Sequence, residues 1–429
     1  MQSSKTNTLL HLSQEAVTIQ WKAGQKSCSV LLLRGKVELF RSSLTRNLRY
    51  TFPEEACIVL EAFGEAAVQI EGDAITVQTP ISSVLDEIHA LLDIARVDAM
   101  LAIEERGKKA LSSSEELKDS WRGPRVLVVG ENQWEREVVS RSLLNLAVRR
   151  DSLYGICYVD VDVAMPMVGC PGTVSAAFVE EPVTPPEDFS VMMPLTFFHG
   201  TASVTSATRK RYLDLCVCAA QAATSLGFAN PKFEAGGFLI HSLSPSTEIQ
   251  HDVLIDVLSI FSVTHVVITG ADWELEKFLY NAVLGRTVQF LRLPKLPDVH
   301  SPSAAGAELR RCAQLERYFF GTPRTPLMPV RGVARISELV LLHAETFEPL
   351  SWGEVPDLCL AAIVWADTAA SAAEANVAGF VALLEVGKEF VSFLAPSGGE
   401  LPKPFLVVSP SLHLPRELVM PLPVTSWAT

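Results

Sequence analysis

The feature that most constrains the fold is an uninterrupted apolar run that ends in a glycine. Residues 125–129 read Arg-Val-Leu-Val-Val, Gly130 follows, and a helical pattern extends from about 135 to 150. A strand that is apolar on both sides is typical of a parallel sheet covered by helices. Further strands of this kind are expected at 158–162, 238–240 and 266–268. Strands alternating with helices predict a doubly wound α/β domain over residues 120–325.

The regions on either side carry short strands with alternating polar and apolar residues. Residues 1–107 predict an N-terminal β-sandwich domain closed by a helix over about 82–105, which has apolar residues at helical spacing. A polar stretch at 107–123 predicts a linker, and the proline-rich stretch at 321–329 predicts a second boundary. Residues 330–429 predict a small β-rich C-terminal domain. The expected fold class is therefore α/β, with a doubly wound domain between two β-rich domains.

Composition excludes several classes of protein. No apolar run reaches the roughly 18 residues of a membrane-spanning helix, and the N-terminus lacks the apolar block of a signal peptide. The net charge of −13 argues against tight autonomous RNA binding. A net charge does not exclude a local basic groove, because it is the sum over the whole chain. The eight cysteines form no C-x-x-C pair and the histidines are scattered, which predicts reduced thiols, no metal site, and a reducing compartment.

The turn after the strand at 125–129 aligns with a phosphate-binding loop, G-x-x-x-x-G-K-[S/T], but keeps only its first glycine, Gly130. Glu135 stands in place of the second glycine, Arg136 in place of the phosphate-binding lysine, and Glu137 and Val138 in place of the hydroxyl residues. The glutamates would satisfy the helix dipole themselves and repel a triphosphate. Periodicity alone is also compatible with an ordinary strand-to-helix turn.

Short segments in a fixed order then point to a family. They are 44–47 (Leu-Thr-Arg-Asn), 123–130 (Gly-Pro-Arg-Val-Leu-Val-Val-Gly), 158–163 (Tyr-Val-Asp-Val-Asp-Val), 171–173 (Pro-Gly-Thr), 317–321 (Arg-Tyr-Phe-Phe-Gly), 377–380 (Val-Ala-Gly-Phe) and 401–403 (Leu-Pro-Lys). Over nearly its whole length the chain resembles the polyribonucleotide 5′-hydroxyl kinases that are also Clp-type subunits of pre-mRNA cleavage factor II. That resemblance implies a P-loop NTPase-like central domain.

The chain departs from the family pattern mainly where the family does chemistry. Besides the loop, the family's D-V-G-Q is 162–165 (Asp-Val-Ala-Met), and its base-stacking T-x-G-W segment is 242–245 (Ser-Leu-Ser-Pro). The lid keeps Arg310 and Arg311, whereas 303–307 (Ser-Ala-Ala-Gly-Ala) cannot stabilise a phosphoryl group. Asp160 and Asp162 are interpreted as relics at a strand end rather than as magnesium ligands.

The resemblance and the departures together predict a pseudokinase. The expected protein is a nuclear, non-catalytic scaffold subunit of an mRNA 3′-end cleavage and polyadenylation complex. No catalytic residue is assigned, and binding of ATP and magnesium is predicted to be lost. The implied partners are the large polymerase-CTD-binding subunit of cleavage factor II and other 3′-end processing factors, with RNA contacted only indirectly and no membrane. Two alternatives stay open: a residual ATP-binding 5′-hydroxyl kinase acting on RNA, and an RNA-binding module without kinase activity.

Overall fold

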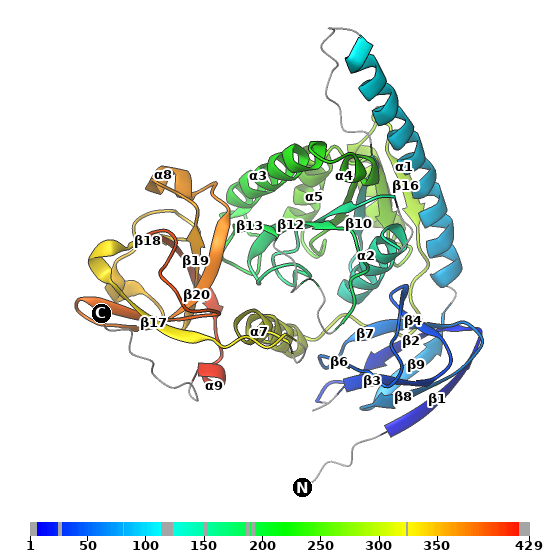
Figure 1. Ribbon diagram of the computed structural model, residues 1–429, viewed down its shortest axis with the longest axis horizontal. Helices are drawn as coiled ribbons and strands as arrows, with labels where there is room; N and C mark the ends of the chain where they lie inside the picture. Colours follow the sequence, from blue (N-terminus) through cyan, green and yellow to red (C-terminus); the bar gives the residue numbers. More distant parts are fainter. Residues whose placement is uncertain are drawn as a thin grey trace. The chain divides into compact units, whose positions relative to one another are not determined.

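The computed structural model describes residues 7–24, 28–79, 81–112, 123–149, 153–185, 189, 194–322 and 325–419 (Figure 1). The extreme N-terminus and most of the predicted linker, 113–122, lie outside the described residues, as do 323–324 of the proline-rich boundary. The chain forms two compact units. One comprises Met1–Val159, Ala177–Asp188 and Ala223–Ala307, and the other Asp160–Ala176, Phe189–Ala222 and Glu308–Thr429. The three-domain division at 1–107, 120–325 and 330–429 stays a prediction.

The first unit begins with two antiparallel sheets. One has the order β1 (Asn7–Ser13), β8 (Glu65–Glu71), β3 (Cys28–Arg34), β6 (Arg49–Phe52). The other has the order β5 (Ser42–Ser43), β4 (Val37–Leu39), β7 (Cys57–Ala62), β2 (Ala16–Trp21), β9 (Ala74–Gln78). Side chains that alternate along these strands form the core, where the Trp21 ring stacks on Phe52 at 5.2 Å between centroids. The short alternating runs in the sequence thus form a β-rich N-terminal region.

A long helix, α1 (Ile81–Ser112), follows the last of these strands. Its inner face is apolar and buried at Leu85, Ile88, Leu92, Ala99 and Ile103. Arg96 is also buried on this face, where its Nε donates to the Gly236 carbonyl at 3.2 Å at the end of α4 (Pro231–Gly236). The helix runs past the predicted end at about 105.

The central sheet confirms the α/β fold class. Its strand order is β13 (Leu195–Phe198), β12 (Thr173–Val179), β11 (Ile156–Asp160), β14 (Phe238–His241), β10 (Arg125–Val129), β15 (His265–Ile268), β16 (Gln289–Arg292). β10 pairs in parallel with both β14 and β15, so it lies in the interior of the sheet, as its uninterrupted apolar sequence predicts. The helices of this region are α2 (Gln133–Ala147), α3 (Arg209–Phe228), α4, α5 (Glu248–Ile260) and α6 (Trp273–Ala282).

The second unit contains a six-stranded sheet. Its order is β17 (Val330–Arg335), β21 (Phe390–Ala395), β20 (Val377–Val386), β19 (Cys359–Val364), β22 (Phe405–His413), β18 (Val340–His343). Short helices η2 (Ile336–Glu338), η3 (Trp352–Glu354), α8 (Ala369–Ala372) and α9 (Arg416–Val419) interrupt the strands, and α7 (Ala304–Phe320) precedes them. The Tyr318 hydroxyl accepts a hydrogen bond from the Phe380 amide at 2.8 Å, which joins α7 to the sheet. Among the described helices none is long and apolar enough to cross a membrane.

Candidate functional site

The turn between β10 and α2 is closed by its own side chains. Asn132 caps α2, and its Oδ1 accepts from the amides of Trp134 at 3.0 Å and Glu135 at 3.4 Å. Two donors that a helix N-terminus could offer to an anion are therefore already bonded. α2 begins at Gln133, two residues before the predicted start, because this cap fixes its first turn. Gly130 is also required for packing, since an added Cβ would collide with the Thr269 hydroxyl.

Arg136, which stands in the place of the phosphate-binding lysine, is fully buried. Its Nη1 donates to the carbonyls of Gly130 at 2.6 Å and Glu131 at 3.1 Å, and its Nη2 donates to Gln133 Oε1 at 2.5 Å. A guanidinium can satisfy several acceptors at once because its donors are fixed in a planar fork. Arg136 therefore bonds to the turn itself.

The two glutamates of the altered loop are also engaged. Glu135 is buried, its Oε1 accepts from the Leu296 amide at 2.8 Å, and burial raises its pKa above the ordinary value. Glu137 pairs with Arg141 at 3.1 Å, one turn further along α2, and the Arg141 guanidinium lies 5.3 Å from the Phe40 ring centroid. Val138 is buried in the core. No local sequence pattern predicts these bonds.

Residues 296–303, called the strap below, connect the turn to the N-terminal strands. At one end of the strap, the Leu296 amide donates to Glu135. Further along it, the Val299 carbonyl accepts from Asn132 Nδ2 at 3.1 Å. His300 bonds to Gln20 twice, through its amide at 3.0 Å and its carbonyl at 2.7 Å. At the far end, the Ser303 amide and hydroxyl both donate to Glu55, at 2.6 and 2.7 Å. Sequence reasoning missed Gln20, Glu55 and Asn132.

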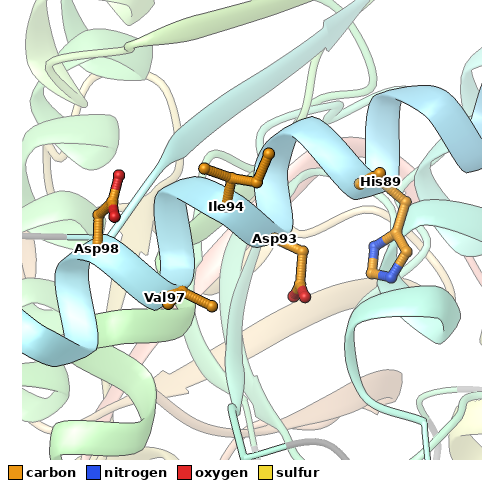
Figure 2. A pocket seen from close by; sticks show the side chains of 6 residues that line it. His89, Asp93, Ile94, Val97 and Asp98 are labelled. Carbon is orange, nitrogen blue, oxygen red and sulfur yellow. The ribbon is translucent and has the colours of Figure 1, made fainter.

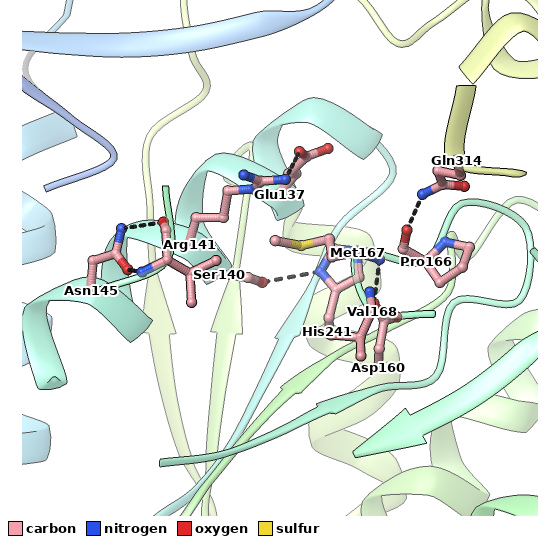
Figure 3. A network of polar contacts seen from close by, with 11 residues as sticks. Glu137, Ser140, Arg141, Asn145, Asp160, Pro166, Met167, Val168, His241 and Gln314 are labelled. Atoms are coloured by element: carbon pink, nitrogen blue, oxygen red, sulfur yellow. Dashed lines mark hydrogen bonds and ion pairs between the residues drawn. The ribbon is translucent and has the colours of Figure 1, made fainter. Parts of the chain in front are cut away.

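Asp160 and Asp162 belong to the second unit, whereas the loop at 130–138 belongs to the first. Asp160 accepts from the amides of Asp162 and Val168, both at 3.1 Å, while Asp162 Oδ1 accepts from the Ala164 amide at 3.0 Å. Burial, and then the charge of Asp162, raise the pKa of Asp160 well above its usual range. Both carboxylates thus bond to the backbone that follows β11, and Figure 3 shows Asp160 beside Met167 and Val168.

A family model described as the mRNA cleavage and polyadenylation factor CLP1 P-loop matches residues 130–321. The chain is 28% identical to the polyribonucleotide 5′-hydroxyl-kinase Clp1 of Danio rerio over 366 residues, covering 83% of this chain and 75% of the relative. The chain therefore resembles the CLP1 family over most of its length. It is also 26% identical to the CLP1 homologue of Arabidopsis thaliana, covering 88% of this chain and 87% of the relative.

Two solved structures of the family share the fold. A wild-type Clp1p–Pcf11p complex gives a TM-score of 0.77 at 19% identity, covering 96% of this chain and 99% of that chain. A structure of the Pcf11p–Clp1p interface in a glycine-to-arginine point mutant that has lost ATP gives the same TM-score at 18% identity, covering 96% and 100%. These two likenesses establish the fold of the CLP1 family for this chain.

The segment that aligns with the CLP1 family's T-x-G-W lies against the turn. Ser244 Oγ donates to the Glu131 carbonyl at 3.1 Å, the same carbonyl that accepts from Arg136. Just before it, His241 Nδ1 lies 3.1 Å from Ser140 Oγ on α2 (Figure 3). The residues at this position therefore support the turn and α2 through hydrogen bonds.

The remaining polar side chains of α2 are likewise structural. Asn145 donates to the carbonyls of Phe40 at 2.8 Å and Val183 at 3.1 Å and accepts from the Val183 amide at 2.7 Å. Of the predicted lid arginines, Arg310 is buried and Arg311 pairs with Glu308. Among the described residues no group of three or more His, Cys, Asp or Glu is placed to hold a metal ion. The eight cysteines are free, and six of them are buried.

Proposed function

We propose that this chain is a non-catalytic subunit of an mRNA 3′-end cleavage and polyadenylation complex, in which the ATP-binding loop has become a structural turn. The observation that carries the proposal is the position of Arg136. Its guanidinium is fully buried and bonded to Gly130, Glu131 and Gln133. A side chain that binds a phosphate has to point its charged group at the ligand, whereas the Arg136 guanidinium points at acceptors of its own turn.

Converting this turn back into a phosphate site would require several bonds to break. Hydrogen bonds that involve a charged group contribute about 1.5–3 kcal/mol each. Three such bonds hold Arg136, and a fourth holds Glu135 to the strap. In addition, the carboxylates of Glu135 and Glu137 at the start of α2 would repel a triphosphate. These costs support a loss of affinity for ATP and magnesium.

The partner follows from the family. Solved relatives are complexes of Clp1p with Pcf11p. We therefore place this chain in the nucleus with the corresponding large polymerase-CTD-binding subunit of cleavage factor II and other 3′-end processing factors, docked chiefly through the central α/β region. The net charge of −13 supports contact with RNA through partners rather than directly.

The alternative function is a residual ATP-binding polynucleotide 5′-hydroxyl kinase acting on RNA. It is favoured by the names of relatives such as the Danio rerio polyribonucleotide 5′-hydroxyl-kinase. The strand, turn and helix that hold a phosphate loop are also present, with Gly130 at its first position. Phosphoryl transfer depends on charge neutralisation and positioning, so this alternative requires Arg136 to leave its present bonds.

One experiment separates the two functions. The full chain is incubated with γ-phosphate-labelled ATP, magnesium and a 5′-hydroxyl RNA oligonucleotide, and calorimetry measures Mg·ATP binding in parallel. We expect no labelled RNA above a no-enzyme control and no binding at micromolar concentrations. Labelling that Arg136→Ala abolishes would establish the kinase instead. The charge reversals Glu135→Lys and Glu137→Lys should not restore activity, because the glycine cradle is still absent.

A further inference from the structure

Helix α1 has an apolar stripe on the face opposite its buried side. Ala90, Ile94, Val97 and Leu101 are all exposed, with exposed fractions of 65%, 44% and 55% for the last three. Their spacing of four, three and four residues places them along one line of the helix. The buried residues Leu92, Ala99 and Ile103 lie on the other side. Because α1 already packs through that inner side, the stripe is a second apolar face.

The edges of this stripe are acidic. Glu87, Asp98 and Glu105 follow one edge, and Asp86, Asp93 and Glu104 the other. The two arginines of this part of α1 turn inward. Arg96 is buried against the Gly236 carbonyl, and Arg106 pairs with Glu234. The charged residues exposed between 86 and 105 are therefore all acidic in the described helix.

The stripe also borders a hollow. A shallow, open pocket of about 450 Å³ is lined by His89, Ala90, Asp93, Ile94, Val97 and Asp98 (Figure 2). These residues come from successive turns of α1, and Figure 2 shows Val97 and Ile94 between Asp98 and Asp93 along the helix. Burial and the nearby Arg96 lower the pKa of His89 to about 4, so His89 is neutral at pH 7 and adds no positive charge to the edges. Asp86 pairs with Arg41 at 3.0 Å and Asp93 lies 4.0 Å from Arg96, so the negative charge of the edges comes chiefly from the exposed Glu87, Asp98, Glu104 and Glu105. The surface is thus apolar, hollowed and negative.

We propose that the outer face of α1 docks an amphipathic helix of a partner protein, which presents an apolar ridge flanked by lysine or arginine. Heptad-like spacing suits a helix lying along α1, and flanking charges select the partner. A second copy of this chain fits poorly, because it would bring acidic edges against acidic edges. This inference goes beyond the proposed function, since α1 carries no part of the altered loop.

The test uses the full chain and a synthetic 21-residue helical peptide with leucine at the two core heptad positions and lysine at the flanking ones. We expect fluorescence anisotropy to detect binding that weakens at least tenfold for the variant Ile94→Asp with Leu101→Asp. The variant Asp98→Lys with Glu105→Lys should weaken it at least as much. The matched control is Leu226→Asp, an exposed leucine on α3, which should leave binding unchanged.

Two control peptides separate docking from attraction to an acidic protein. One replaces the leucines by serine and keeps the lysines, and the other keeps the leucines and replaces the lysines by glutamate. Neither should bind. The proposal would be overturned if the serine peptide bound as well as the leucine–lysine peptide. It would also be overturned if the leucine–lysine peptide did not bind, or if the α1 variants had no effect on its binding. Light scattering that shows a dimer of this chain, dissociated by Ile94→Asp, would overturn it in favour of a second copy.

Discussion

At the scale of single residues, Arg136 explains how the turn between β10 and α2 is held. A lysine ammonium is a compact charge that moves on a flexible stem, whereas a guanidinium presents a planar set of donors. At Arg136 these donors reach two backbone carbonyls and one side-chain oxygen at the same time. The Arg136 side chain therefore stabilises the turn between β10 and α2.

Arg136→Ala should therefore lower the free energy of unfolding by about 3 kcal/mol or more, since it leaves buried acceptors without their donor. Arg136→Lys should recover only part of this loss. Urea denaturation followed by circular dichroism measures both. Arg335→Ala is the control, because Arg335 is exposed and its pair with Glu338 spans 3.8 Å, so it should change stability by less than about 0.5 kcal/mol.

His199 should make stability depend on pH. Burial lowers its pKa from 6.5 to about 4, and its Nε2 lies 3.3 Å from the Ser203 carbonyl. Between these values the unfolded chain binds the proton and the folded chain does not, so stability falls as pH falls through this window. Between pH 7 and 5 the wild type should lose about 2 kcal/mol more than His199→Gln. Equal losses in the two proteins would show that His199 does not titrate in this way.

At the scale of elements, the strap explains how the N-terminal strands and the altered turn are joined. Glu135 and Asn132 hold one part of it, and Gln20 and Glu55 hold the rest. Glu55 also explains why a glycine stands at position 306 near the start of α7, since a Cβ added to Gly306 would collide with the Glu55 carboxylate. If residues 296–303 opened and closed during a catalytic cycle, these hydrogen bonds would have to break each time.

Removing one attachment should loosen the strap without unfolding the protein. Glu55→Ala takes the acceptor from the amide and hydroxyl of Ser303. At about 1.5–3 kcal/mol for a bond to a charged group, amide hydrogen exchange over 296–303 should accelerate roughly ten- to hundredfold. Peptide-resolved mass spectrometry measures the rate. Glu338→Ala, at an exposed position outside the strap, should leave it unchanged, and an unchanged rate in Glu55→Ala itself would contradict the role given to the strap.

At the scale of the whole molecule, charge decides which partners the chain can bind directly. A net charge of −13 opposes the phosphate contacts that supply most non-specific affinity for nucleic acid. The segment at 242–245, in place of the family's base-stacking tryptophan, bonds to the turn instead. Both observations favour a protein that works through protein surfaces.

We therefore expect the purified chain to bind a 20-nucleotide single-stranded RNA more weakly than about 100 μM at 150 mM salt, at the weak end of non-specific nucleic-acid binding. Fluorescence anisotropy with a labelled RNA measures it, and a polylysine of similar length serves as the positive control. Binding in the low micromolar range that weakens steeply with salt would instead favour the RNA-binding alternative.

Local sequence was sufficient to predict the central α/β fold. Residues 125–129 are apolar throughout because β10 lies between β14 and β15, and the loop could be aligned because Gly130 and the following helix keep their spacing. The C-terminal region is β-rich, as predicted, although its edge strand β17 has a mixed sequence without a clear alternation.

Tertiary structure alone decided how the polar residues are used and which faces are buried. Gln20 meets His300 across 280 positions in the chain, a pairing that no local pattern contains. The sequence placed Ile94, Val97 and Leu101 among the apolar residues of a packed helix, yet they are exposed. α1 has apolar residues on two faces, and periodicity cannot say which face has neighbours. The packing of α4 and α2 against the inner face makes that choice, and it leaves the apolar stripe and its acidic edges facing solvent.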